Sequence, residues 1–486
     1  MDGTVTDRVH SRRGAVALAC VLMIAAAPAP ARAAGLDLSL PDLGDPSSQA
    51  LPANEEARIG QEMMREIRQE VALIDDPAVN AYIRDLGSRI AGATETPAAD
   101  YRFFVVADPR INAFAMPGGH VGVHSGLITA SRNESELGSV IAHELAHVTQ
   151  RHIARRIAAA EQTSLRTAAM VLAGLVIGSQ SPQAGMAAVT TGMATGVDRQ
   201  LAYSRDHERE ADRTGMRILT GAGLDPMGMA DFFKVLNDDN RYRSRAPAFL
   251  STHPLTEARI ADVRSMAREM EPDSVFESPD YAYIRARVQV ATADRPGDAL
   301  EAFRARVERN DSAAGRYGLA LALTADGQTD AATARLESLI ETQGAHDLLY
   351  LALAEAALEG GRTDAALASI EDGLSLFPDS VGLRVGRVEA LLQADRGRDA
   401  LAATRSLTRG QPNAPGLWEL RARAASAASD PDESALAMAQ YYAVQGDLEA
   451  GLSQLRRVSD ISASPAQRAR ADALRQRWEA RLTHTG

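Results

Sequence analysis

Cysteine is nearly absent from this chain, since Cys20 is the only one among its 486 residues. Cys20 lies in an N-terminal segment that has the pattern of a removable export signal, and the mature chain then contains no thiol. Such a chain forms no disulfide, and it must bind any metal through nitrogen and oxygen atoms. Aromatic residues are also scarce, at 4%, whereas alanine is abundant. This composition favours closely packed helices over a β-sandwich.

Positive charge is in deficit as well. The 52 Lys and Arg are outnumbered by 64 Asp and Glu, which gives a net charge of -12 and a pI near 5.4. General electrostatic attraction to nucleic acid or to anionic lipid is therefore excluded, and we expect no nucleic-acid partner. The length, with 45% hydrophobic residues, suffices for more than one domain.

The first residues carry the parts of an export signal. A basic start precedes an apolar run, Ala15 to Ala27, and the small residues Ala31-Arg32-Ala33 follow. We predict that residues 1–33 are a signal peptide cleaved after Ala33 and that residues 34–53 form an exposed lead-in. The alternatives are a lipoprotein attached at Cys20, which few apolar residues precede, twin-arginine export through Arg12-Arg13, and a retained anchor. The apolar run is shorter than the ~20 residues that span a bilayer.

The pattern His-Glu-x-x-His occurs at His143, Glu144 and His147, in a run from Ser139 to Arg156 that lacks Gly and Pro and is expected to be helical. Residues four apart lie about 40° apart around a helix, so the two histidines can share one metal ion. Glu144 lies about 100° from His143, where its carboxylate can contact a metal-bound water. Zinc peptidases with a glutamate general base have this arrangement. The alternative is a surface helix with two incidental histidines.

A second acidic helix offers the third ligand. Glu208 and Asp212, four residues apart in YSRDHEREADRTG, share one helical face, whereas Glu210 points to the far side as a solvated surface charge. Glu208 can therefore complete the metal site. Asp212 can accept a hydrogen bond from the outer ring nitrogen of a ligating histidine and fix its tautomer. His152, about 140° from His147 around one continuous helix, is a poor ligand.

The segment before the metal motif predicts a small sheet after two helices. The helices are expected at Asn54–Glu70 and at Pro77–Ala91, followed by strands at Tyr101–Ala107, Ala113–Met116 and His120–Val123. Zinc peptidases hold an extended substrate along a sheet edge. We assign this edge to the residues Met116, Gly118, Gly119, His120 and Val121. We expect His120 and His124 to be hydrogen-bonded or exposed rather than metal ligands.

The segment from Ala168 to Gly196 is apolar but interrupted by Gly, Ser and Pro. Neither arm is long enough to span a membrane comfortably. One interpretation is a helical hairpin that covers the catalytic core. The other is a flap that makes a peripheral membrane contact or admits substrate.

From about Tyr281 onward the pattern becomes a helical repeat. Ala332, Ala366 and Ala400 are 34 residues apart, Pro378 and Pro412 share this interval, and Gly327 and Gly361 each precede an alanine by five residues. This period and placement are typical of tetratricopeptide repeats, which offer a concave surface to a protein partner. The alternative is an alanine-rich bundle without a binding groove.

The stretches Asn112–Ile128 (NAFAMPGGHVGVHSGLI), HELAH and SRDHEREAD resemble the BepA-like branch of the HtpX-type zinc metallopeptidases, over roughly Asn54 to Met270. The resemblance implies one zinc ion per chain, bound by His143, His147 and Glu208, with Glu144 and Asp212 as catalytic residues and no other cofactor. The fold class is then mainly α. We expect a zincin-like (gluzincin) α+β domain with a small sheet at residues 54–275 and an all-α tetratricopeptide-repeat solenoid at 280–486.

The stretch Phe249–Arg259 (FLSTHPLTEAR) contains one more candidate. His253 precedes Pro254, so it lies in an extended loop just before a helix that Thr256 can cap. On its own it can be an ordinary loop histidine. The resemblance implies that such a His-Pro loop can reach the zinc and occupy the position of the catalytic water. We therefore hypothesise that His253 is an inhibitory fourth ligand.

By the same resemblance, the chain is expected to be a periplasmic zinc endopeptidase. It would degrade misfolded or stalled outer-membrane β-barrel proteins and assist their assembly, while the repeats contact the assembly machinery. The alternative is a chaperone or scaffold that acts mainly through the repeats and has little protease activity.

Overall fold

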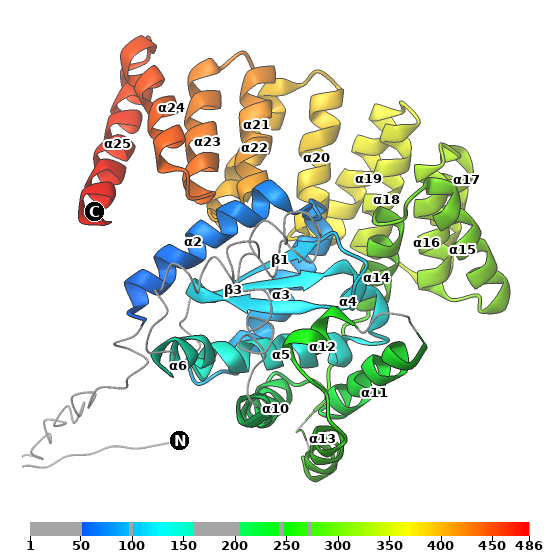
Figure 1. The fold of residues 1–486 in the computed structure, drawn as a ribbon. Helices are drawn as coiled ribbons and strands as arrows, with labels where there is room; N and C mark the ends of the chain where they lie inside the picture. The colour runs from blue at the N-terminus through cyan, green and yellow to red at the C-terminus, as the bar shows by residue number, and fades with distance from the viewer. Residues whose placement is uncertain are drawn as a thin grey trace, which may run out of the picture. The chain divides into compact units, whose positions relative to one another are not determined.

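The central element of the N-terminal half is a three-stranded sheet (Figure 1). Its strands are β1 (Arg102–Val106), β2 (Ala113–Met116) and β3 (His120–His124), in the order β1-β3-β2. β1 pairs with β3 in parallel, and β2 pairs with β3 in antiparallel register. The computed structural model describes residues 51–96, 101–159, 205–242, 247–270, 272 and 274–485. The predicted signal peptide, most of the lead-in, and the segment from Ala168 to Gly196 lie outside these residues.

Successive side chains of each strand serve two different cores, because strand residues alternate between the sheet faces. Val105, Val121 and Val123 pack into the main core with helix α5 (Glu134–Thr149). Phe104, Phe114 and Met116 pack on the opposite face, in a cluster with helix α2 (Ala53–Glu70). The sheet is therefore covered by α5 on one face and by α2 on the other (Figure 1).

The predicted strands and first two helices agree with the structure to within one or two residues. Further helices of this part are α3 (Pro77–Gly92), α4 (Ser125–Ala130), α6 (His152–Ala159), α10 (Arg205–Gly221), α11 (Met227–Tyr242), α12 (Ala248–Thr252), α13 (Glu257–Glu269) and α14 (Asp280–Ala291), with a 3-10 turn η1 (Pro117–Gly119). Among the helices within the described ranges, none is long and apolar enough to cross a bilayer.

Two predictions about this region were wrong. The substrate edge cannot include His120 and Val121, because both lie in β3, which pairs with β1 and β2 on its two sides. The run from Ser139 to Arg156 is also not one helix. α5 ends at Thr149 and α6 begins at His152, with Arg151 between them at φ 52°. A left-handed residue breaks a right-handed helix, even without Gly or Pro.

Helix α5 is buried along its whole length from Glu134 to His147. Asn133 caps its N-terminus by accepting a hydrogen bond from the Glu136 amide. The carboxylate of Glu277 accepts two more, from the amides of Glu134 (2.8 Å) and Ser135 (3.2 Å). A helix that is buried all round belongs to the core, so the surface-helix interpretation is wrong.

The C-terminal part consists of paired helices. They are α15 (Pro296–Arg309), α16 (Ala313–Ala325), α17 (Thr329–Gln343), α18 (Asp347–Glu359), α19 (Thr363–Leu376), α20 (Val381–Gln393), α21 (Gly397–Gly410), α22 (Pro415–Ala427), α23 (Pro431–Val444), α24 (Leu448–Ile461) and α25 (Pro465–Thr485). The repeated alanines, Ala332, Ala366 and Ala400, have no exposed surface, and each belongs to a buried apolar cluster of the repeats. The predicted fold class, mainly α with a small sheet and a helical repeat, is confirmed.

The turns of the repeats keep the 34-residue period beyond the glycines. Gly327 and Gly361 have φ of 77° and 71°, and Asp395 and Ser429, at the next two intervals, have φ of 54° and 58°. Each of the four turns has a hydrogen bond from the following amide to a carbonyl five residues back, for example from Arg396 N to Leu391 O. This is the Schellman arrangement that ends a helix.

The two parts of the chain meet at a buried arginine. Arg287 of α14 pairs with Asp76, which caps α3, and with Glu355 of α18. Its guanidinium also donates to the Tyr317 hydroxyl at 3.1 Å. Because a buried charge is costly unless it is paired, this network favours one arrangement of the helices it joins.

Candidate metal centre

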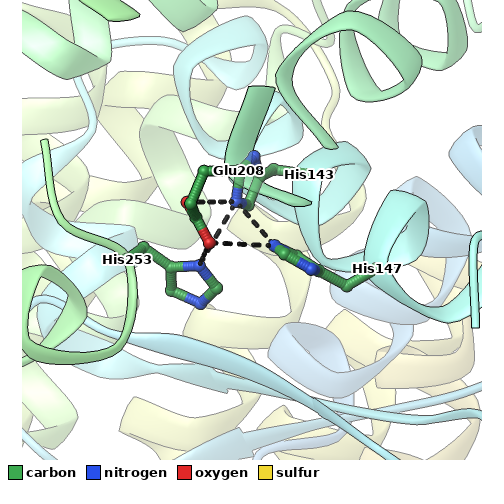
Figure 2. Close-up of side chains that lie close together, drawn as sticks. All are labelled: His143, His147, Glu208 and His253. Atoms are coloured by element: carbon green, nitrogen blue, oxygen red, sulfur yellow. Dashed lines mark hydrogen bonds and ion pairs between the residues drawn. The ribbon is translucent and has the colours of Figure 1, made fainter. Parts of the chain in front are cut away.

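Four side chains converge from three separate segments on one buried point (Figure 2). His143 and His147 come from α5, Glu208 comes from α10, and His253 comes from the loop between α12 and α13. Each offers one nitrogen or oxygen atom, and these atoms lie within 4.8 Å of one another. All four side chains are at most 3% exposed, so the cluster is shielded from water.

The spacing of these atoms matches a tetrahedral zinc site. Zinc bonds of ~2.0–2.1 Å at tetrahedral angles place neighbouring ligand atoms ~3.3 Å apart. Nε2 of His143 lies 3.0 Å from Nε2 of His147 and 3.4 Å from Nδ1 of His253. The Glu208 carboxylate lies 3.6 Å from each Nε2 of the helix pair and 3.0 Å from Nδ1 of His253. The donor set contains nitrogen and oxygen only, as zinc accepts.

A glycine allows the two metal-site helices to approach each other. A Cβ at Gly215 of α10 would lie 3.1 Å from the backbone N and Cα of His143. This close contact positions α10 so that Glu208 and Asp212, one turn apart, face His143. Burial alone would raise the pKa of Glu208, but the neighbouring His253 and His143 outweigh it and lower that pKa far below its usual range. Glu208 is therefore an anion that attracts a cation.

Asp212 lies behind the first histidine, as its spacing predicted. Its carboxylate is 3.2 Å from Nδ1 of His143, on the ring side away from the cluster. Burial opposes ionisation of Asp212, but hydrogen bonds from Arg259 and His143 outweigh it and lower its pKa. Histidines that bind metals commonly donate their outer N–H to such a carboxylate.

Sequence reasoning missed Arg259, which is 3% exposed. Its guanidinium forms two hydrogen bonds of 2.7 Å to the Asp212 carboxylate, lies 2.8 Å from Glu208, and donates to the Pro254 carbonyl at 2.8 Å. It therefore links the third ligand Glu208, the Asp212 carboxylate behind His143, and the His253 loop. The available signal was its place in FLSTHPLTEAR, on the helix that Thr256 caps by accepting from the Arg259 amide.

Glu144 projects beside the cluster toward the edge strand β2. Its Oε2 accepts a hydrogen bond of 3.1 Å from the Ala115 amide. That amide therefore points away from β3, along the edge of the sheet. Burial raises the pKa of Glu144, which makes this carboxylate a better proton acceptor.

His253 is held in place by Phe249, at the start of α12. The His253 ring stacks on Phe249 at a centroid distance of 4.5 Å, and its amide donates to the Phe249 carbonyl at 2.9 Å. Nδ1 of His253 faces the cluster, and its Nε2 lies 3.4 Å from Oε1 of Glu144. The ring thus contacts both the group that the sequence assigns as third ligand and the group that it assigns as base.

The interpretation of Glu210 as a solvated surface charge was wrong. Its carboxylate is about one third exposed and lies 3.2 Å from Nε2 of His152 and 3.0 Å from the guanidinium of Arg155. The break at Arg151 turns His152 out of the position that one continuous helix would give it. Burial lowers the pKa of His152 to about 4, so this ring is neutral near pH 7.

The structure does not bring His120 or His124 to the cluster. Both lie in β3 and both are buried. His120 is in register with Met116 of β2, and His124 is in register with Val106 of β1, two residues whose side chains pack in the cluster with α2. His124 instead lies 3.3 Å from the Asp108 carboxylate. Of the predicted edge residues, Met116 ends β2, whereas Gly118 and Gly119 form the turn η1 and have φ of 76° and 79°.

A buried His-Glu-x-x-His helix, a carboxylate from a second helix, and a base beside a sheet edge define a metallopeptidase, here followed by a helical-repeat arm. The model of peptidase family M48 matches residues 77–267, and a tetratricopeptide repeat model matches residues 357–424. The chain belongs to peptidase family M48, in the branch of the beta-barrel assembly-enhancing proteases.

The similarity to this branch extends over nearly the whole chain. The chain is 36% identical over 430 residues to the putative beta-barrel assembly-enhancing protease of Vibrio cholerae, covering 88% of this chain and 89% of that protein. It is 33% identical over 450 residues to the beta-barrel assembly-enhancing protease of Escherichia coli K12, covering 92% of each. The mitochondrial metalloendopeptidase OMA1 of Schizosaccharomyces pombe is 28% identical over 223 residues, which cover 44% of this chain and 62% of that protein. The predicted enzyme class, a metallopeptidase, is confirmed.

Proposed function

We propose that this chain is a zinc endopeptidase of the periplasm that cleaves misfolded or stalled outer-membrane β-barrel proteins and assists their assembly. The domain limits of this proposal are residues 54–275 for catalysis and 280–486 for the repeats. The observation that carries the zinc assignment is the spacing of 3.0–3.6 Å among the donor atoms of His143, His147 and Glu208. The names of the relatives support the substrate class.

The chain's own groups supply the remaining chemistry. A bound zinc ion would polarise the scissile carbonyl and acidify a water molecule. Glu144, with its raised pKa, takes the proton of the attacking water and returns it to the leaving amine. Asp212 keeps the His143 ring in the tautomer whose Nε2 faces the cluster.

The sheet edge that holds the substrate is β2 rather than β3. Within the described residues β2 pairs with β3 alone, and its Ala115 amide points toward Glu144. An extended peptide beside Ala115 and Met116 can pair main chain to main chain with β2, which places a scissile bond near the base. Displacement of the Glu144 carboxylate from the Ala115 amide would free both groups at once.

The His253 loop keeps the enzyme latent in this proposal. Catalytic zinc sites keep one position open for water, whereas four protein ligands close the coordination sphere. His253 supplies the fourth donor atom, with Nδ1 3.4 Å from Nε2 of His143. Its Nε2 also faces Glu144 at 3.4 Å, so the same ring occupies the approach to the base. The loop must move before water and substrate can enter.

The test compares wild type, Glu144→Gln and His253→Ala in zinc content and in cleavage of an unfolded β-barrel protein. Glu144→Gln should retain about one zinc per chain and lose cleavage, whereas His253→Ala should retain zinc and cleave faster. Proteolysis by pure Glu144→Gln would refute the assignment of the base, and unchanged or lower cleavage by His253→Ala would refute latency. Barrel assembly supported by a repeat-only fragment that lacks Glu144 would favour the alternative, a chaperone or scaffold that acts mainly through the repeats.

A further inference from the structure

His147 has an outer partner of its own, in a place where the sequence offered none. Its Nδ1 lies 2.7 Å from Nδ1 of His152, and Nε2 of His152 lies 3.2 Å from Oε2 of Glu210. The contact depends on the break between α5 and α6. Because Arg151 adopts φ 52°, the chain turns, and the first residue of α6 faces back toward His147.

The proton positions along this chain of contacts follow from the metal site. Nε2 of His147 faces the cluster, so a neutral His147 ring carries its hydrogen on Nδ1. That N–H donates to Nδ1 of His152, which must then be unprotonated. His152 carries its own hydrogen on Nε2 and donates it to the Glu210 carboxylate. Every donor meets an acceptor, and both histidines are neutral.

The surroundings hold these groups in place. His152 has no exposed surface. Its ring stacks on His207 with centroids 4.4 Å apart and 18° between the planes. The guanidinium of Arg155 lies 3.0 Å from the same Oε2 of Glu210 that His152 contacts. Since buried rings with hydrogen-bonded nitrogens have little freedom, His152 can fix the orientation of the ring beside it.

We propose that His152 and Glu210 are positioning residues for the metal ligand His147, in a relay that runs from Glu210 through His152 to His147. The relay is the counterpart of the single carboxylate, Asp212, that contacts His143. Helix α10 thus supplies the third ligand Glu208, the carboxylate of Asp212 that contacts His143, and the carboxylate of Glu210 that acts on His147 through His152. These three residues are two apart in the sequence. This inference rests on the proposed zinc site and deepens it.

The test measures the zinc dissociation constant of the full chain by competition with a chelator of known affinity. His152→Phe keeps the ring size and removes both nitrogens, and it should weaken zinc binding about 10- to 100-fold, the usual effect of losing an outer partner. Glu210→Ala should weaken it several-fold. The cobalt-substituted protein should show shifted visible absorption bands in both variants, because the orientation of one ligand changes.

Two control variants separate this role from general destabilisation. His124→Phe replaces another buried histidine, 1% exposed, that lies in β3 away from the cluster. Asp206→Ala removes a carboxylate that is 93% exposed on the same helix as Glu210. Both should leave the zinc dissociation constant within about twofold of wild type. A merely structural His152 would lower the melting temperature of His152→Phe without changing zinc affinity of the folded protein.

Zinc affinity within twofold of wild type in both His152→Phe and Glu210→Ala would overturn the relay. If His152→Phe does not fold, Glu210→Ala decides the question, because its carboxylate is partly exposed. A wild-type chain that binds no stoichiometric zinc would instead overturn the proposed function. The two failures are therefore distinguishable.

Discussion

Removal of the Arg259 guanidinium should destabilise the protein more than any surface substitution of arginine. Arg259 is 3% exposed and pairs with two buried carboxylates, Asp212 through two hydrogen bonds of 2.7 Å and Glu208 at 2.8 Å. In Arg259→Ala these charges stay buried and lose their cation. Breaking a buried ion pair from one side costs about 3–5 kcal/mol. The hydrogen bond to the Pro254 carbonyl, which ties down the His253 loop, is lost as well.

The assay is calorimetric unfolding in the presence of a chelator, so that bound metal does not compensate for the missing cation. At ~2–4 °C per kcal/mol for a domain of 150–250 residues, the melting temperature of the catalytic part should fall by roughly 10 °C. Arg259→Lys should recover only part of the loss, because one ammonium cannot replace a fork that contacts two carboxylates. Addition of zinc should reduce the difference in melting temperature between each variant and wild type, because the metal supplies the missing positive charge.

Arg264→Ala is the matched control, since Arg264 lies on the same helix with an exposed side chain. It should change the free energy of unfolding by less than about 0.5 kcal/mol. If the free energy of unfolding of Arg259→Ala lies within about 1 kcal/mol of the wild-type value, the buried ion pairs contribute little to stability and the reasoning is wrong.

Three further predictions concern other parts of the molecule. Zinc at ~1,000 times its dissociation constant should stabilise the metal-free protein against thermal unfolding by about 4 kcal/mol, and an unchanged melting temperature would contradict the metal site. Asp280 and Asp347 outweigh burial and raise the pKa of His346 to about 9, so the stability that this ion pair adds is fully present below about pH 6.5 and is lost as the pH rises through 9. Chemical denaturation from pH 6 to 10 should show a loss on the order of 1–3 kcal/mol that His346→Gln lacks. Gly215→Ala places a Cβ 3.1 Å from the backbone of His143 and should cost about 1–3 kcal/mol and weaken zinc binding, whereas Gly410→Ala, with open space around it, should be near neutral.

Much of the fold follows from local patterns in the sequence. Short runs rich in apolar residues mark the three strands, and the 34-residue interval of small residues marks the repeats. At the turns themselves, the sequence showed the period only in Gly327 and Gly361, yet Asp395 and Ser429 continue it with positive φ. Asp and Ser give no clear signal for such a turn, because the hydrogen bonds of the turn, rather than the residue type, hold the conformation there.

The order of strands in the sheet was beyond the sequence. β2 and β3 form a hairpin, and either could have been the edge. β1 pairs in parallel with β3, so β3 is central, and among the described strands β2 is the one that turns an amide toward Glu144. Long-range pairing decides this, and no local pattern encodes it.

The sequence by itself determined the donor set: His143 and His147 one turn apart, Glu208 and Asp212 on one face, and no thiol outside Cys20. Helical periodicity is a local property, so spacing alone predicts which side chains share a face. The tertiary structure decided which other groups surround them. Arg259, His152 and Glu210 reach the centre only because a loop, a helix break and the packing of α10 against α5 bring them there. Such contacts depend on how helices far apart in the sequence pack together, and the spacing of residues along one helix does not specify that packing.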